Sequence, residues 1–307
     1  MSAASGTRAI VAALGANLGI AATKFIAFAL TGSSSMLAES IHSVADSGNQ
    51  ALLLVGGRRA RREATAEHPF GFGRERYIYA FIVSIVLFSV GGLFALYEGY
   101  HKLSDPHPID SWQWVPIVVL VIAIGLEGFS FRTAIQESNK LRGRSGWVAF
   151  VRRSRVPELP VVLLEDFAAL IGLVFALFGV SLTLITENGV WDGIGTVLIG
   201  LLLVAVAFIL AIETKSLLIG ESATGENEAR IRTAIVDGTE IEQIIHMKTL
   251  HLGPEELLVA AKVGVRRGST AEDVADAIDA AERRIRQAVP IAQVIYVEPD
   301  IYREPSA

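Results

Sequence analysis

The chain has 307 residues, of which 51% are hydrophobic and only 19% are charged, whereas an average soluble domain carries about 25% charged residues. It contains no cysteine, and its net charge of −5 at pH 7 arises in residues 214–307, because residues 1–213 hold 16 basic and 16 acidic side chains. This composition excludes a disordered chain, a disulfide scaffold and a basic nucleic-acid-binding surface, and it indicates a membrane protein with an acidic soluble tail.

Six stretches are predicted to cross a membrane as helices, since roughly 20 mostly apolar residues span the hydrocarbon core. They cover residues 10–30, 35–56, 78–100, 114–133, 159–186 and 193–212. The second stretch is the least hydrophobic because it contains polar side chains, namely Glu39, His42, Asp46, Asn49 and Gln50. Residues 1–213 are therefore expected to form an all-α polytopic membrane domain with six transmembrane helices.

Basic residues are concentrated in two of the segments that connect these stretches. Residues 58–76 and residues 139–155 hold six basic side chains each, while residues 31–34, 103–111 and 187–192 hold none. The positive-inside rule then predicts that both termini are cytoplasmic, in the plasma (inner) membrane if the organism is prokaryotic. Segment 139–155 is expected to orient the protein or to contact anionic lipid.

Residues 214–307 have a soluble pattern that predicts a small ferredoxin-like α+β cytoplasmic domain. A helix is expected at residues 226–236, and strands are expected at residues 243–251, 257–266 and 293–297. A second helix should begin after Ser269-Thr270-Ala271-Glu272, a capping box in which Ser269 caps the helix and Glu272 reaches back. The order α-β-β-α-β contains no catalytic constellation, so we expect a binding or dimerisation module.

The main functional signal is a set of ionisable side chains inside the predicted spans, because each costs roughly 2.5–3.5 kcal/mol at a helix centre on insertion scales. In the second span, Glu39, His42, Asp46 and Asn49 are spaced 3, 4 and 3 residues apart. This spacing places all four on one face of a helix. An imidazole and a carboxylate four residues apart can both reach one metal ion.

The fifth span contributes two consecutive carboxylates, Glu165 and Asp166, inside an otherwise apolar run. Imidazole and carboxylate groups from two helices make a nitrogen–oxygen site suited to a divalent transition metal. One such residue alone is more often an interhelical hydrogen bond, and a proton relay uses the same residue types. Several on two helices favour the metal site, and the interpretations overlap because titratable ligands exchange protons for metal.

Five stretches of the chain stand out together, and they read MLAESIHSVADSGNQ, HPFGFGRERY, VVLLEDFAALIG, DGIGTVLIGLLL and LIGES. They resemble the cation diffusion facilitator family, and the second and third look most like the branch that contains zinc transporter nine. The resemblance extends over essentially the whole chain. It implies a homodimer that exports Zn²⁺ or a related divalent metal from the cytoplasm in exchange for protons.

Position by position, the resemblance implies that the second-span ligands are His42 and Asp46. In the fifth span, one family ligand position matches Asp166. The other falls on Val162, whose side chain has no donor atom.

The fourth ligand is therefore an open question at this point. Glu165 lies one helical turn after Val162 on nearly the same face and is the candidate replacement. Glu39, one turn from His42, or a water molecule is the alternative. Such a ligand set suits Zn²⁺ but, without cysteine, also admits Mn²⁺, Fe²⁺, Co²⁺ or Ni²⁺.

Two further metal sites of the family have incomplete ligand sets here. His68 matches one position of the first, but a second position falls on Phe72, so we expect His68 to be solvated. In the tail His246 matches a ligand position, while the positions that should complete the site include Lys262 and Glu298. A cation at Lys262 argues against a regulatory metal there.

These observations favour a proton-coupled secondary transporter that exports divalent metal cations. Its substrates would be the metal ion and protons, it would sit in the lipid bilayer, and no resident cofactor is expected. The alternative is a non-transporting membrane metal sensor or scaffold whose tail recruits partners. An enzyme is not expected, because the sequence contains no nucleophile–base pair and no phosphate-binding loop.

Overall fold

The computed structural model describes the backbone of residues 3–109, 112–238 and 241–301, and side chains from residue 17 onward. The chain forms two compact units. The first, which we call the helical unit, comprises Met1–Arg58 and Tyr77–Lys215. The second, the sheet unit, comprises Arg59–Arg76 and Ser216–Ala307. Residues 1–2 and 302–307, the termini predicted to be cytoplasmic, lie outside the described residues.

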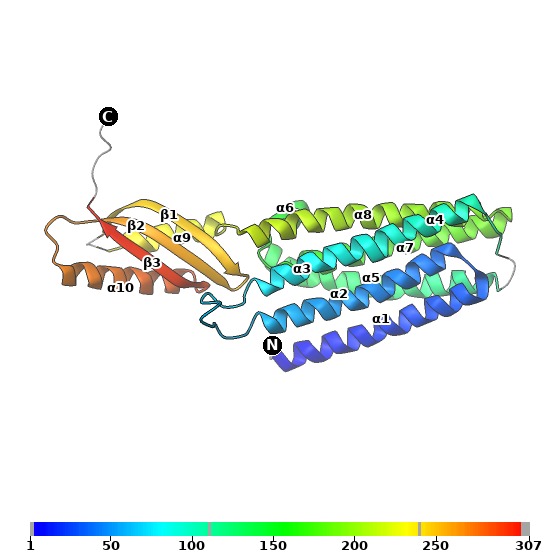
Figure 1. The fold of residues 1–307 in the computed structure, drawn as a ribbon, viewed down its shortest axis with the longest axis horizontal. Coiled ribbons are helices and arrows are strands. Elements are labelled where there is room, and N and C mark those ends of the chain that lie inside the picture. The colour runs from blue at the N-terminus through cyan, green and yellow to red at the C-terminus, as the bar shows by residue number, and fades with distance from the viewer. Residues whose placement is uncertain (1–2, 110–111, 239–240, 302–307) are drawn as a thin grey trace, which may run out of the picture. The chain divides into compact units, whose positions relative to one another are not determined.

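The helical unit consists of long helices that run alongside one another (Figure 1). Its elements are α1 (Ala3–Thr31), α2 (Ser34–Arg59), α3 (Glu75–Val86), the π-helix η1 (Leu87–Leu93), α4 (Phe94–Ser104), α5 (Trp114–Arg142), α6 (Trp147–Arg153), α7 (Glu158–Thr186) and α8 (Val190–Ile219). The basic segment 139–155 contains the end of α5 and the whole of α6, so most of it is helical.

Four helices in the described part of the chain are long and apolar enough to cross a membrane. They are Glu75–Ser104, which joins α3, η1 and α4, and the helices α5, α7 and α8. They contain the predicted spans 78–100, 114–133, 159–186 and 193–212. The spans predicted at residues 10–30 and 35–56 lie within α1 and α2, but the apolar helix described in α1 is limited to Asn17–Thr31.

Small residues allow α8 to approach the Glu75–Ser104 helix closely. A Cβ on Gly92 would lie 2.7 Å from Val204 Cγ2, and a Cβ on Gly200 would lie 2.8 Å from the backbone nitrogen of Leu96. Larger residues at these two positions would force the helices apart. Small residues at helix interfaces are a common means of packing in membranes, where lipid chains are as apolar as leucine.

The start of α2 is fixed by a carboxylate from another helix. Asp192, fully buried near the beginning of α8, accepts hydrogen bonds from Ser33 Oγ (3.0 Å), from the Ser34 amide (2.8 Å) and from the Ser35 amide (3.2 Å). The first amides of a helix lack intrahelical partners and carry a partial positive charge, so an anion stabilises them. Asp192 thus caps α2 and joins it to α8.

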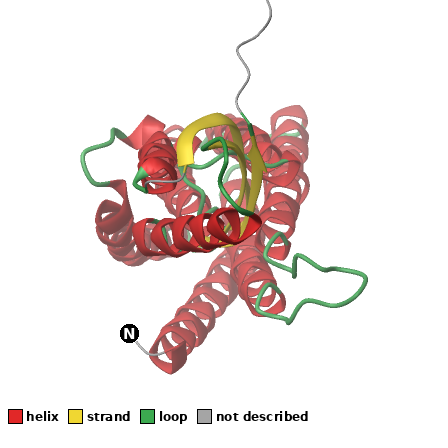
Figure 2. Cartoon of the chain, turned by 90° about the vertical axis from the view of Figure 1, so that its left-hand side faces the viewer, coloured by secondary structure: helices red, strands yellow, loops and turns green. Residues whose placement is uncertain are grey.

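The sheet unit contains α9 (Gly225–Val236), β1 (Ile241–Gly253), β2 (Glu256–Val265), α10 (Ala271–Ala288) and β3 (Ala292–Asp300). The strand order is β1-β2-β3; β1 and β2 are antiparallel, and β2 and β3 are parallel. The strands form a curved sheet (Figure 2). Its apolar core joins both helices to the strands, as shown by Ile231 and Ile285 packing in one cluster with Leu257, Val259 and Val263.

The predicted order of elements in the tail is present, but the predicted cap of its second helix is wrong by one residue. Thr270, not Ser269, is the N-cap of α10, and its Oγ1 accepts from the Asp273 amide at 3.2 Å. Asp273, not Glu272, reaches back and accepts from the Thr270 amide at 2.9 Å. Two hydrogen bonds to the Asp273 carboxylate, from the Thr270 hydroxyl at 2.7 Å and from the Thr270 amide, lower the pKa of Asp273 below its ordinary value. The reason is that α10 begins at Ala271, which makes Asp273 its third residue.

We expect Thr270→Ala to loosen the first turn of α10. Loss of such a cap costs about 1 kcal/mol, which corresponds to roughly fivefold faster opening of that turn. Hydrogen exchange of the Ala271–Ala288 amides in the full-length protein measures this. Ser269→Ala is the matched control and should leave exchange unchanged; equal effects of the two substitutions would contradict the cap. Because the pKa of Asp273 is lowered, the stabilisation that its carboxylate gives to the first turn of α10 is present at neutral pH. This stabilisation is lost as the pH falls through the lowered pKa.

Candidate metal-transport site

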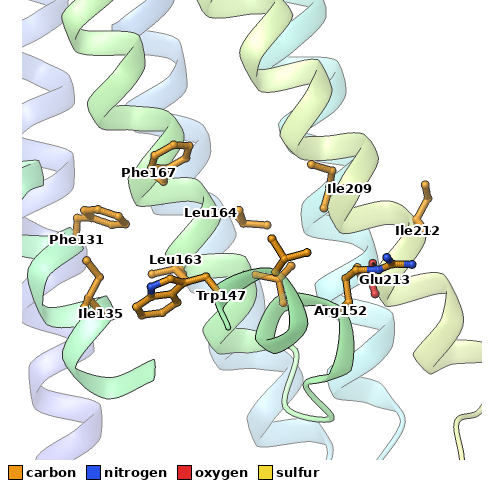
Figure 3. A pocket seen from close by; sticks show the side chains of 12 residues that line it. Phe131, Ile135, Trp147, Arg152, Leu163, Leu164, Phe167, Ile209, Ile212 and Glu213 are labelled. Atoms are coloured by element: carbon orange, nitrogen blue, oxygen red, sulfur yellow. Dashed lines mark ion pairs between the residues drawn. The ribbon is translucent and has the colours of Figure 1, made fainter. Parts of the chain in front are cut away.

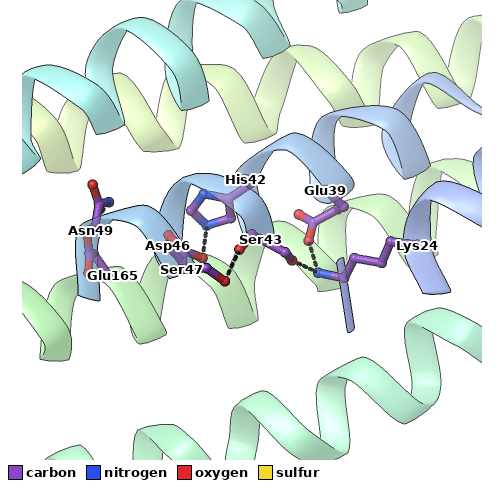
Figure 4. Close-up of polar contacts among 8 residues, drawn as sticks. All are labelled: Lys24, Glu39, His42, Ser43, Asp46, Ser47, Asn49 and Glu165. Atoms are coloured by element: carbon purple, nitrogen blue, oxygen red, sulfur yellow. Dashed lines mark hydrogen bonds and ion pairs between the residues drawn. The ribbon is translucent and has the colours of Figure 1, made fainter. Parts of the chain in front are cut away.

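The polar side chains of the second predicted span lie along one buried face of α2 (Figure 4). Glu39 and Asn49 are 0% exposed and His42 is 1% exposed, while the Asp46 side chain keeps 14% of its surface. Neighbouring helices cover this face, so it lies inside the helical unit. We call these four residues the polar face of α2.

Several polar atoms on this face have no hydrogen-bond partner among the described residues. They are Glu39 Oε1, both ring nitrogens of His42, Asp46 Oδ1 and Asn49 Oδ1. The contact between His42 Nε2 and Asp46 Oδ2 is 3.5 Å, longer than a good hydrogen bond. Buried polar groups in proteins are normally paired, and each one left unpaired costs about 1–3 kcal/mol. A row of such atoms on one helix is suited to binding a ligand.

The two carboxylates of α7 are held by two different helices. Glu165, which is 4% exposed, accepts a hydrogen bond from Asn49 Nδ2 of α2 at 2.7 Å. Asp166, 8% exposed, accepts one from Ser130 Oγ of α5 at 2.9 Å. Consecutive residues of a helix are about 100° apart, which is why adjacent side chains reach different neighbours. Glu165 therefore lies beside the polar face of α2, and Asp166 faces α5.

The four predicted ligands make separate short-range contacts. His42 and Asp46 are adjacent on α2, whereas Glu165 and Asp166 are occupied by the amide and hydroxyl just described. Over the described residues, no group of three or more His, Asp or Glu side chains is arranged to hold a metal ion. The fourth family position, Val162, packs with an apolar cluster formed by Ala134, Phe150 and Leu163.

The structure adds a residue that was not predicted from the sequence. Lys24 of α1 is 1% exposed, and its ammonium donates to Glu39 Oε2 at 3.0 Å and to Ser43 Oγ at 2.8 Å. Figure 4 shows this contact one turn along α2 from His42. The sequence signal was available, since a single lysine inside the apolar stretch 10–30 needs a buried partner.

The π-helical turn of the Glu75–Ser104 helix lies beside the same face. A Cβ on Gly91 would be 3.9 Å from His42 Nδ1 and 3.3 Å from Leu203 Cδ1. Single π-helical turns inside α-helices occur frequently at functional sites. A side chain at Gly91 would therefore crowd Leu203 and contact the imidazole of His42.

The two additional histidines lie in other surroundings. The His68 ring packs against Phe72 with ring centroids 4.7 Å apart, and His68 is exposed. His246 is paired in register with Lys262, whose ammonium contacts Glu298 Oε1 at 3.0 Å and Asp300 Oδ2 at 3.1 Å. These carboxylates raise the pKa of Lys262, so the charge that a metal would neutralise there is already neutralised by a side chain.

The fold is that of a multi-pass helical membrane protein with ionisable groups buried between its helices, a combination found in proton and ion transporters. Residues 10–219 match the cation efflux transmembrane domain. The chain belongs to the cation efflux family, which confirms the resemblance in its motifs. This is a family of transporters and not of enzymes.

Individual relatives agree with this assignment. The mitochondrial proton-coupled zinc antiporter SLC30A9 of Xenopus laevis is 34% identical over 243 residues, which cover 78% of this chain and 43% of that protein. Metal tolerance protein C4 of Arabidopsis thaliana is 28% identical over 83% of this chain and 56% of its own length. Magnetosome protein MamM of Magnetospirillum gryphiswaldense is 27% identical over 36% of each chain. The chain thus spans less than half of the antiporter.

We expect Asn49→Ala to destabilise the helical unit, because it leaves the Glu165 carboxylate buried without this donor. A buried group deprived of its partner costs about 1–3 kcal/mol, which should lower the melting temperature by several degrees. Thermal unfolding of the purified protein in detergent measures the change. Gly48→Ala is the control, because its Cβ would contact nothing within 4 Å. An Asn49→Ala protein that melts with the wild type would contradict the contact.

Proposed function

We propose that the protein is a proton-coupled antiporter that exports divalent metal cations, Zn²⁺ foremost, from the cytoplasm. The proposed ligands are His42, Asp46, Asp166 and Glu165. The observation that carries this proposal is the row of buried polar atoms without partners on α2, next to a carboxylate of α7. Family membership and the printed names of the relatives support the substrate class.

The donor set supports a borderline metal. Imidazole nitrogen and carboxylate oxygen suit Zn²⁺, and the absence of cysteine from all 307 residues removes the soft thiolate ligand. The same donors accept Mn²⁺, Fe²⁺, Co²⁺ and Ni²⁺. The name of the Xenopus laevis relative, a zinc antiporter, favours Zn²⁺ among these.

In the proposed cycle, His42 and the carboxylates bind the metal in their deprotonated forms. For Glu165 and Asp166 to join the α2 ligands, each has to exchange its present partner, Asn49 or Ser130, for the metal. Movement of the helices then exposes the site to the opposite side, where protons compete for the same lone pairs and release the ion. Metal and proton therefore exclude each other at one set of atoms.

The same proposal includes the arrangement of the whole chain. We place α1 and α2 in the membrane with the four apolar helices, as a six-helix domain over residues 1–213. Residues 214–307 would be a ferredoxin-like cytoplasmic domain, supported by the order α9-β1-β2-α10-β3. Both termini would be cytoplasmic, which the basic segments favour, and the functional protein would be a homodimer.

His42→Ala and Asp46→Ala are each expected to reduce metal-driven proton flux at least tenfold in sealed proteoliposomes, since each removes a ligand from a site of four. Ser47→Ala is the control on the same buried helix, because its hydroxyl bonds only to the Ser43 carbonyl among the described contacts. Flux at the wild-type level in either ligand variant would exclude this site. Metal binding without any proton flux in the wild type would instead support the sensor or scaffold.

The identity of the fourth ligand is tested through Lys24. We propose that its ammonium holds Glu39 away from the metal, so that Glu165 completes the set. Lys24→Met combined with Glu39→Gln removes both charges of a buried pair, which is often tolerated, and should retain transport. Glu165→Gln should lose most of it, because the amide no longer offsets the metal charge. If the paired substitution abolishes metal binding in a folded protein while Glu165→Gln does not, Glu39 is the ligand.

A further inference from the structure

A cavity of about 720 Å³ lies among α5, α6, α7 and α8 of the helical unit (Figure 3). Twelve side chains line it, and ten of them are apolar. Several of these are large and exposed, including Phe167 (41%), Ile209 (42%) and Ile212 (50%). Large apolar side chains exposed together indicate a surface that another apolar group covers.

The short helix α6 closes one side of this cavity, and its Phe150 side chain is buried against neighbouring helices. Phe150, 6% exposed, packs in the apolar cluster with Ala134 of α5 and Leu163 of α7. The adjoining face of α6 presents Trp147 and Val148 to the cavity, and Val148 is 74% exposed. A helix that begins with five apolar residues and ends with Arg152 and Arg153 is suited to the boundary between the acyl chains and the headgroups of a bilayer.

The cavity has one polar end. Its two charged lining residues are Arg152 and Glu213, whose Nε and Oε1 atoms are 3.7 Å apart. Figure 3 shows this pair on the opposite side of the cavity from Phe131 and Ile135. The Arg152 side chain is 72% exposed, and the contact with Glu213 uses only its Nε, so the other donors of the guanidinium can bind an anion.

We propose that this cavity binds an anionic glycerophospholipid. Its acyl chain would lie against the apolar residues of α5, α7 and α8, and its phosphate would contact Arg152 and Arg153 at the end of α6. Charge complementarity supports this occupant, because residues 139–155 carry six basic and no acidic side chains. A basic cluster beside a membrane helix attracts anionic lipid by about 1 kcal/mol per residue near the surface.

The bound lipid would contact the helix that carries the two carboxylates. Leu163, Leu164 and Phe167 of α7 line the cavity, and they flank Glu165 and Asp166 in the sequence. The occupied cavity would thus support α7 from the side opposite α2. Lipid binding itself is independent of metal transport, so it can be tested whether or not the proposed function holds.

Trp147 provides a direct probe of the occupant. The chain has four tryptophans, and replacing Trp112, Trp114 and Trp191 by Phe leaves Trp147 as the only one. In phosphatidylcholine vesicles, phosphatidylglycerol with brominated acyl chains should quench this fluorescence saturably at low mole fraction. The initial slope should be at least threefold steeper than with brominated phosphatidylcholine. Native mass spectrometry of the unaltered chain, comparing retention of the two unlabelled lipids, gives the same comparison if the triple variant does not fold.

Two variants locate the binding site. Arg152→Gln should reduce the phosphatidylglycerol slope to that of phosphatidylcholine. Arg144→Gln makes the same change in charge at a residue that does not line the cavity, and it should leave the slope unchanged. Leu164→Asn, which places a polar amide against the acyl chain without changing charge, should weaken lipid binding and move saturation to a higher mole fraction. Equal quenching by both brominated lipids in proportion to their mole fraction overturns the proposal. Selective quenching that saturates at the same mole fraction in Leu164→Asn also overturns it, because the lipid would then bind outside the cavity.

Discussion

The ion pair between Lys24 and Glu39 sets the arrangement of the first two helices. Neither charge has access to water, so each is stable only while the other stays within hydrogen-bond distance. In a bilayer, apolar helix surfaces gain little from meeting one another, because lipid chains are equally apolar. Polar contacts therefore decide which faces meet: Lys24 with Glu39, Asn49 with Glu165, and Asp192 with the start of α2.

Some polar groups of α2 are hydrogen-bonded to other helices, and the polar atoms that lie between those contacts are not. At its first turn, Asp192 pairs the helix amides, and at Asn49 the amide nitrogen is paired with α7. Between them, the nitrogens of His42 and one oxygen of Asp46 have no hydrogen-bond partner in the described part of the chain. Proteins depart from complete pairing chiefly at functional sites, and the surrounding structure must stabilise the departure. Here the contacts on either side of these atoms, at the start of α2 and at Asn49, do so.

Features that depend on local periodicity were predictable from the sequence, and features that depend on helix rotation were not. Hydropathy identified α7 and α8, and the 3-4-3 spacing identified the polar face of α2. The partner of Lys24 could not be derived, because an interhelical contact depends on how two helices are turned toward each other. The helices that Glu165 and Asp166 contact could not be derived from the sequence for the same reason.

Some local features of the structure also could not be predicted from the sequence. Ser269 and Thr270 both belong to the residue types that cap helices, so the sequence alone does not identify Thr270 as the cap of α10. The short helix α6 has too few residues for a periodic signal. The π-helical turn at Leu87–Leu93 lies where Gly91 and Gly92 face Leu203 and Val204 of α8, and the sequence indicates this contact only as two adjacent glycines.

The two adjacent carboxylates of α7 constrain the rotation of that helix about its long axis. One side chain is fastened to α2 and the other to α5, about a quarter of a turn apart. Rotation of α7 about its long axis displaces both carboxylates in the same sense. Such a rotation cannot break the Asn49–Glu165 contact without also straining the Ser130–Asp166 contact, so the two contacts together fix the orientation of α7.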